Sequence, residues 1–184
     1  MEKKEIETFC ATSRRHWRQW LQKNHAKKQC IWLIMYKKDA GVPTVSWSHA
    51  VEEALCFGWI DSIRKTLDDE RFIQYYSKRK PKSVWSKINK EKVTQLIDQG
   101  LMTEAGLKSI QVAKQNGSWT VLDEVEALKI PADLEAKFKS LPGSKARFLS
   151  LSKSVRKFML FGLMHAKRPE TRKKRIDEIM AACR

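Results

Sequence analysis

The hydrophobic pattern changes near residue 120, and this change constrains the fold more than any other feature of the sequence. Before it, the short apolar run 30–36 and the segments 62–67 and 71–76 are typical of strands and lie among helix-like segments. From about residue 121 onward the pattern is helical throughout, with amphipathic stretches such as Phe148, Leu151, Val155 and Phe158 at three- and four-residue spacings. The pattern predicts an α+β fold in which a small antiparallel sheet packs against helices. We expect a body of residues 1–120 and an all-helical portion of residues 121–184 packed on it as one compact unit.

Capping residues mark where the helices begin. Ser13, Thr103 and either Ser46 or Ser48 can accept a backbone hydrogen bond at a helix start, and Asn89 is predicted to cap a further helix. The run 30–36 predicts a buried strand, and Asp68–Glu70 between two strand-like segments predict a β-hairpin. Residues 148–162 predict one amphipathic helix, and a last helix follows Pro169.

The strongly positive net charge of the chain favours negatively charged binding partners. The net charge is +16 and the isoelectric point is near 9.8, so the chain attracts polyanions such as nucleic acid and anionic membrane surfaces. The longest apolar runs, 31–36 and 158–164, are far shorter than the roughly 20 residues of a transmembrane helix. No signal-peptide pattern is present. We therefore expect a soluble, cytoplasmic protein.

The sequence lacks the residue patterns that metal or cofactor binding requires. The four cysteines form no Cys-x-x-Cys pair, and the four histidines show no ligand spacing on a helix. A glycine-rich phosphate loop and a Gly-x-Ser-x-Gly elbow are both missing from the sequence. We predict neither a metal nor a cofactor, and reduced cysteines that are mostly buried.

An enzyme would have to use Cys56 or Asp61. Cys56 has His49 on a similar helix face, but roughly 10 Å away along the axis, beyond hydrogen-bond reach. Glu52 and Glu53 lie one turn from Cys56, where a carboxylate disfavours the thiolate. A structural cysteine is the favoured interpretation, and a non-enzymatic protein is favoured over an enzyme.

The candidate ligand site is the segment from Trp59 to Asn89. The preceding helix is predicted to end at Asp61. A basic loop that folds back over this helix end would form a concave site with aromatic walls and cationic hydrogen-bond donors. Such a concave site suits a phosphate, a carboxylate or an aromatic anion. The simpler alternative is a solvated loop beside a core tryptophan. The predicted ligand-binding residues are Trp59, Asp61, Arg79, Lys80, Lys82, Ser83, Trp85 and Asn89.

A second basic cluster lies near the C-terminus. Much of it falls on the first turns of the last helix, where cations oppose the helix dipole, and this placement indicates an anionic partner. A solvated helix face is the simpler alternative. The cluster consists of Lys167, Arg168, Arg172, Lys173, Lys174 and Arg175.

Several motifs together resemble one family of bacterial proteins. These motifs are Trp17-x-x-Trp20-Leu21, Ile31-Trp32-Leu33 with Tyr36-Lys37-Lys38, residues 52–62 (EEALCFGWIDS), residues 79–86 (RKPKSVWS) with Asn89, and residues 166–172 (AKRPETR). They are similar to the YdeI/OmpD-associated family, also described as bacteriocin-protection proteins. The resemblance implies a protective role and lends no catalytic residues.

The residues and the resemblance together favour a non-catalytic protein that binds an anionic ligand or protects against stress or bacteriocins. Two alternatives stay open. One is a nucleic-acid-binding accessory protein, which predicts a continuous positive face joining the Arg79 and Arg172 clusters. The other is an enzyme that uses Cys56 or Asp61.

Overall fold

The computed structural model describes residues 6–184 and divides the chain into two compact units. The first unit ends at Trp119 and the second begins at Thr120. That the helical portion packs on the body as one unit stays a prediction. Within residues 6–184, no helix combines the length and the apolar character needed to cross a membrane.

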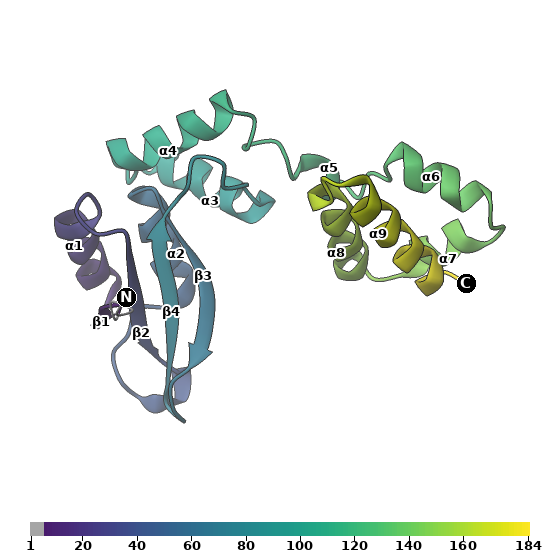
Figure 1. The fold of residues 1–184 in the computed structure, drawn as a ribbon. Coiled ribbons are helices and arrows are strands. Elements are labelled where there is room, and N and C mark those ends of the chain that lie inside the picture. The colour runs from purple at the N-terminus through teal and green to yellow at the C-terminus, as the bar shows by residue number, and fades with distance from the viewer. Residues whose placement is uncertain (1–5) are drawn as a thin grey trace, which may run out of the picture. The chain divides into compact units, whose positions relative to one another are not determined.

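A four-stranded sheet and several helices form the N-terminal unit (Figure 1). The sheet order is β1-β2-β4-β3, with β1 parallel to β2 and the other neighbours antiparallel. The elements are β1 (Thr8–Cys10), α1 (Arg14–Asn24), β2 (Cys30–Tyr36), a 3-10 turn (Lys38–Ala40), α2 (Trp47–Cys56), β3 (Trp59–Thr66), β4 (Arg71–Lys78), α3 (Lys87–Asp98) and α4 (Glu104–Gln115). The predicted α+β class is confirmed, and β1 makes the sheet mixed.

One face of the sheet holds the core of this unit. Along β2 the buried residues alternate with half-buried ones, so Ile31 and Leu33 point inward while Trp32 lies on the other face. The predicted buried strand is therefore buried on one face only. On the inner face, the Trp17 ring of α1 lies 5.3 Å from the Tyr76 ring of β4. The Ser13 side chain caps α1, as its position in the sequence predicts.

The C-terminal unit is all-helical within the described residues (Figure 1). Its helices are α5 (Asp123–Glu126), α6 (Ala132–Lys139), α7 (Ser144–Ser150), α8 (Lys153–His165) and α9 (Pro169–Ala182). A separate core of buried residues, with Leu134, Phe148 and Leu160 among the least exposed, holds them together.

Three predicted boundaries are wrong, each because a different local signal prevails. The helix predicted to end at Asp61 ends at Cys56, since Gly58 has a φ of 72° and Trp59 already begins β3. Ser86, not Asn89, accepts the capping hydrogen bond of α3. The single helix predicted over residues 148–162 is two helices, because Ser152 caps a new start.

Candidate functional site

A basic cavity of about 430 Å³ lies in the N-terminal unit where the end of β4 meets α4. Apolar and aromatic residues form part of its wall, among them Phe57, Pro81, Trp85 and Val112. No acidic side chain is among the described residues that line it. The basic residues of the lining are His25, Lys78, Arg79, Lys80 and Lys108.

The close approach of α4 to the end of α2 shapes this cavity. The Thr103 hydroxyl, which also caps α4, donates to the Cys56 carbonyl oxygen at 2.6 Å. Gly106 allows this approach, because a Cβ there would lie 2.3 Å from the same oxygen. The contact fixes the register of α4, whose Ala105, Lys108, Ser109 and Val112 then line the cavity at helical spacing.

Arg79 is held in the cavity wall by three contacts. Its backbone N–H donates to the Gly58 carbonyl at 2.9 Å, and its Nη2 donates to the Val84 carbonyl at 2.8 Å. The guanidinium carbon lies 3.7 Å from the centre of the Trp85 ring, a close cation–π contact. Its Nη1 is buried and has no hydrogen-bond partner among the described residues.

Burial lowers the pKa of Arg79 to about 10, and the negative charge of Asp61 offsets only part of this effect. Arg79 still carries its charge at neutral pH. The cavity therefore contains a cation whose charge the surrounding protein does not fully compensate.

The basic loop that carries Arg79 is anchored to the C-terminal end of α4. The Pro81 carbonyl accepts hydrogen bonds from Asn116 Nδ2 at 2.7 Å and from Ser118 Oγ at 3.3 Å. The Trp85 ring also packs on the Trp119 ring, with 5.0 Å between centres. These contacts fix one side of the cavity before any ligand is bound.

Two lysines at the cavity keep their ammonium groups available. Lys80 and Lys108 are exposed, and neither forms an ion pair with a described residue. Lys78 differs, because its Nζ donates to the Ala26 carbonyl at 2.8 Å. Lys80 and Lys108 are therefore the cations best placed to meet a ligand that enters from solvent.

The predicted ligand-binding residues do not all meet at this cavity. Arg79, Lys80 and Trp85 line it, whereas Trp59 is fully buried in the core and donates its indole N–H to the His25 carbonyl at 3.3 Å. Lys82, Ser83 and Asn89 are not part of the lining. Lys78, His25 and Lys108 complete the basic set. Lys78 is next to Arg79 in the sequence, but no pattern in the sequence connects His25 and Lys108 to the loop.

Asp61 lies in β3 on the helix-covered side of the sheet. Its carboxylate accepts hydrogen bonds from Trp47 Nε1 at 3.1 Å and Gln74 Nε2 at 3.4 Å. Burial raises its pKa, while the Trp47 hydrogen bond and the Arg79 charge oppose the rise. Asp61 does not line the cavity, so its influence on a ligand there is electrostatic.

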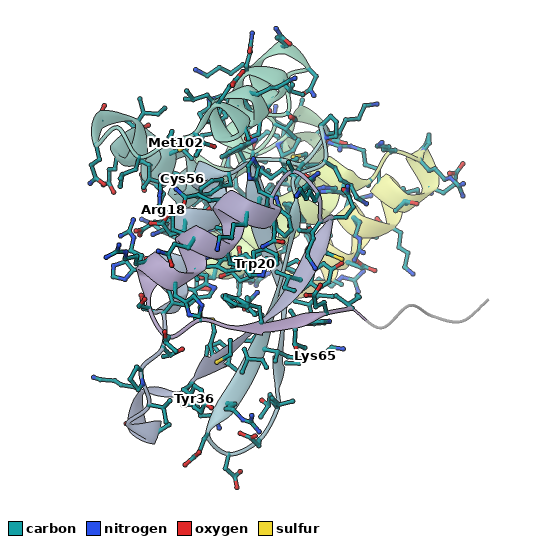
Figure 2. All side chains as sticks on the ribbon, turned by 90° about the vertical axis from the view of Figure 1, so that its left-hand side faces the viewer. Arg18, Trp20, Tyr36, Cys56, Lys65 and Met102 are labelled. Carbon is teal, nitrogen blue, oxygen red and sulfur yellow. The ribbon has the colours of Figure 1, made fainter. Side chains whose placement is uncertain are left out.

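Cys56 lacks the environment of a nucleophile. It is fully buried at the end of α2, and burial, reinforced by the charge of Glu53, raises the pKa of its thiol to about 11. Arg18 lies beside it and lowers the pKa, but by less (Figure 2). The protonated thiol therefore predominates at neutral pH.

We expect iodoacetamide to modify Cys56 in the folded protein at least about a hundredfold more slowly than an ordinary thiol, because both its thiolate fraction and its access are low. The rate should rise with pH toward 11. Mass spectrometry of digested samples taken over time measures this rate, with the half-buried Cys10 and Cys30 as internal comparisons. Rapid labelling of Cys56 at neutral pH would support the enzyme alternative.

The C-terminal basic cluster is partly explained by ion pairs within its own unit. Arg172 Nη2 donates to Asp133 Oδ1 at 2.9 Å, and Arg172 Nη1 donates to the Leu163 carbonyl at 2.9 Å, so this arginine ties α9 to α6 and α8. Arg175 pairs with Glu178 at 3.0 Å. The other members, Lys167, Arg168, Lys173 and Lys174, are exposed without an ion-pair partner among the described residues.

Within residues 6–184, no cluster of three or more histidine, cysteine or acidic side chains could hold a metal ion. The basic cavity is chemically suited to anions, because all its charged lining groups are cationic.

Comparisons with known proteins identify two family models along the chain. Residues 9–109, more than half of the chain, match a family described as Domain of unknown function (DUF8412). Residues 127–184 match the family described as Bacteriocin-protection, YdeI or OmpD-Associated. The predicted family resemblance is confirmed over this second segment, which contains only the last of the motifs that suggested it. No curated protein and no solved structure matches the chain.

Proposed function

The chain belongs to the family of the domain of unknown function DUF8412, and its residues 127–184 match the YdeI/OmpD-associated family. We propose that this family member is a non-catalytic protein that binds a small organic anion. The ligand would occupy the basic cavity beside Arg79. A protective role against bacteriocins or other stress, which the name of the C-terminal family suggests, would follow from this binding.

The incompletely compensated positive charge of the cavity is the observation that carries the proposal. Buried cations in proteins are normally paired, yet among the described residues Arg79 Nη1 has no hydrogen-bond partner, the cavity lining has no carboxylate, and the charge of Asp61 offsets the burial of Arg79 only in part. An anion that enters the cavity would reduce this imbalance and would gain charge-assisted hydrogen bonds from Lys80 and Lys108.

The size and the walls of the cavity indicate the kind of anion. A volume of about 430 Å³ lies within the range of ligand pockets and is far larger than one phosphate ion requires. Phe57, Pro81 and Val112 provide apolar surface among the cations. We therefore favour a phosphate or carboxylate attached to an apolar or aromatic body over a free inorganic ion.

We expect phenyl phosphate to bind more tightly than inorganic phosphate, and we expect the double variant Lys80→Ala, Lys108→Ala to weaken its binding by about tenfold or more. Isothermal titration calorimetry at fixed ionic strength measures both affinities. The matched control is Lys38→Ala, Lys65→Ala, which removes the same charge from exposed sites of the same unit outside the cavity.

The control separates site binding from general attraction to a +16 protein. Its affinity for phenyl phosphate should stay within about twofold of the unmodified chain. An equal loss in both double variants would contradict the cavity proposal and would favour non-specific polyanion binding, the nucleic-acid alternative included.

A further inference from the structure

Helix α8 has apolar side chains on two faces, and only one of these faces is buried. Leu160 and Leu163 lie in the core of the C-terminal unit. Val155, Phe158 and Phe161 lie at a spacing of three residues on another face and are 41%, 76% and 39% exposed. Exposed apolar residues that gather on one face, unlike single scattered ones, are typical of an interaction site.

This exposed face borders a groove between α8 and α9. The groove has a volume of about 480 Å³ and is mainly apolar, with Met159 and Ile179 among its lining residues beside Phe158 and Phe161. Gly162 leaves it empty, because a Cβ at that position would meet only side-chain atoms of Arg175, at 3.8 Å and beyond. All its lining residues belong to the C-terminal unit, so the groove is built within that unit.

Positive charge lies at the end of the groove where α8 stops. Arg175 lines the groove itself, whereas Lys174, its neighbour on α9, lines a separate shallow hollow together with Glu170 and Asp177. Lys167 and Arg168 directly follow Ala166, the lining residue at the end of α8. Glu178 is the one acidic lining residue among those described, and it is already paired with Arg175.

We propose that the groove binds an amphipathic helix of a partner protein, with the apolar side of that helix in the groove and acidic residues beside Lys167 and Arg168. A concave groove beside the protruding Phe158 fits inserted side chains, which a flat lipid surface does not supply. A second copy of this chain is disfavoured, because two chains of charge +16 repel each other.

The length of the groove sets the length of the partner segment. Its lining runs along α8 from Phe158 to Ala166 at the helix end, a rise of roughly 12 Å at 1.5 Å per residue. A partner helix of about three turns covers this length and would place leucine-sized residues at i, i+3, i+4 and i+7 along the groove.

A synthetic helical peptide tests the proposal directly. The probe is a fluorescein-labelled peptide of about 14 residues with leucines at the i, i+3, i+4 and i+7 positions and glutamates elsewhere. The control peptide has lysine in place of every glutamate. Fluorescence anisotropy with the full chain should detect binding of the acidic peptide. The lysine peptide should bind at least about tenfold more weakly, because the rim and the whole chain of charge +16 repel it, so substitutions within the groove are needed to assign the binding to the groove.

Gly162→Leu provides the decisive variant, since its side chain would fill the groove. It should weaken binding of the acidic peptide by about tenfold or more, whereas Gly162→Ala, which adds one methyl group, should change it by less than about threefold. Circular dichroism checks that Gly162→Leu is folded. Phe158→Ser is a second variant with the same expected loss, and its 76% exposed side chain makes misfolding no concern.

Three outcomes would overturn the proposal. The first is equal binding of the acidic and basic peptides. The second is unchanged binding in folded Gly162→Leu and in Phe158→Ser. The third is binding of the chain to anionic lipid vesicles, lost in Phe158→Ser, with no binding of the acidic peptide, which would assign the exposed face to a membrane surface.

Discussion

Replacing Glu53 by glutamine should destabilise the N-terminal unit by about 3 kcal/mol, because this carboxylate holds two arginines together. Glu53 is only 2% exposed, and its two oxygens accept separate hydrogen bonds, from Arg14 Nε at 2.6 Å and Arg18 Nη1 at 2.7 Å. A neutral glutamine leaves Arg18 without its counter-charge and leaves Arg14 with Glu52 alone, whose carboxylate lies 3.2 Å from Arg14 Nη1. We place the loss at the lower end of the range for a broken buried pair, because both arginines keep partial access to solvent.

The distribution of tryptophan makes the measurement selective. All seven tryptophans lie between residues 17 and 119, so tryptophan fluorescence during urea unfolding reports on the N-terminal unit alone. Glu91→Gln removes the same charge from an exposed pair with Lys87 on α3 and should change the free energy of unfolding by less than about 0.5 kcal/mol. Similar losses in the two variants would mean that net charge, and not the buried pairing, controls stability.

The sequence predicts the elements of the fold better than it predicts their contacts. Ser13 and Thr103 mark helix starts correctly, since a capping side chain acts on a backbone N–H only three residues away. The pairing of Glu53 with Arg14 and Arg18 joins residues more than 30 positions apart. The sequence does not indicate whether Glu52 or Glu53 faces inward, so this network of ion pairs could not be predicted.

The same limit applies to the candidate site. Arg79, Lys80 and Trp85 are neighbours in the sequence, and local composition suffices to place them on one loop. His25 and Lys108 reach the cavity from two separate helical regions, because α1 and α4 both pack on α2. Trp59 is fully buried in the core. The sequence could not distinguish it from a ligand-binding tryptophan, because an aromatic residue at the start of a polar strand is equally common in a core and in the wall of a pocket.

Replacing Gly106 by alanine should destabilise the N-terminal unit by about 3 kcal/mol, because the added methyl group has no space. Its Cβ would lie 2.3 Å from the Cys56 carbonyl oxygen and 2.8 Å from Met102 Cε. The Met102 side chain can rotate away, but the Cys56 carbonyl is fixed backbone at the end of α2, where Thr103 also binds it. Helix α4 must therefore shift, and Lys108 would move with it, so the affinity for phenyl phosphate should fall as well.

Gly162→Ala is the matched substitution with the opposite expected sign. Its Cβ would meet only Arg175 side-chain atoms, at 3.8 Å and beyond, so the higher helix propensity of alanine should stabilise α8 by up to about 1 kcal/mol. Tryptophan fluorescence should detect the Gly106→Ala loss but not the Gly162→Ala gain, because the C-terminal unit has no tryptophan, whereas far-UV circular dichroism should detect both. An unchanged fluorescence transition in Gly106→Ala would show that α2 and α4 do not approach closely enough to require glycine. That result would remove the contact that sets the register of the α4 wall, and it would weaken the proposal that the cavity binds an anion. The proposal that the groove between α8 and α9 binds a helix would be unaffected, because the groove does not depend on that contact.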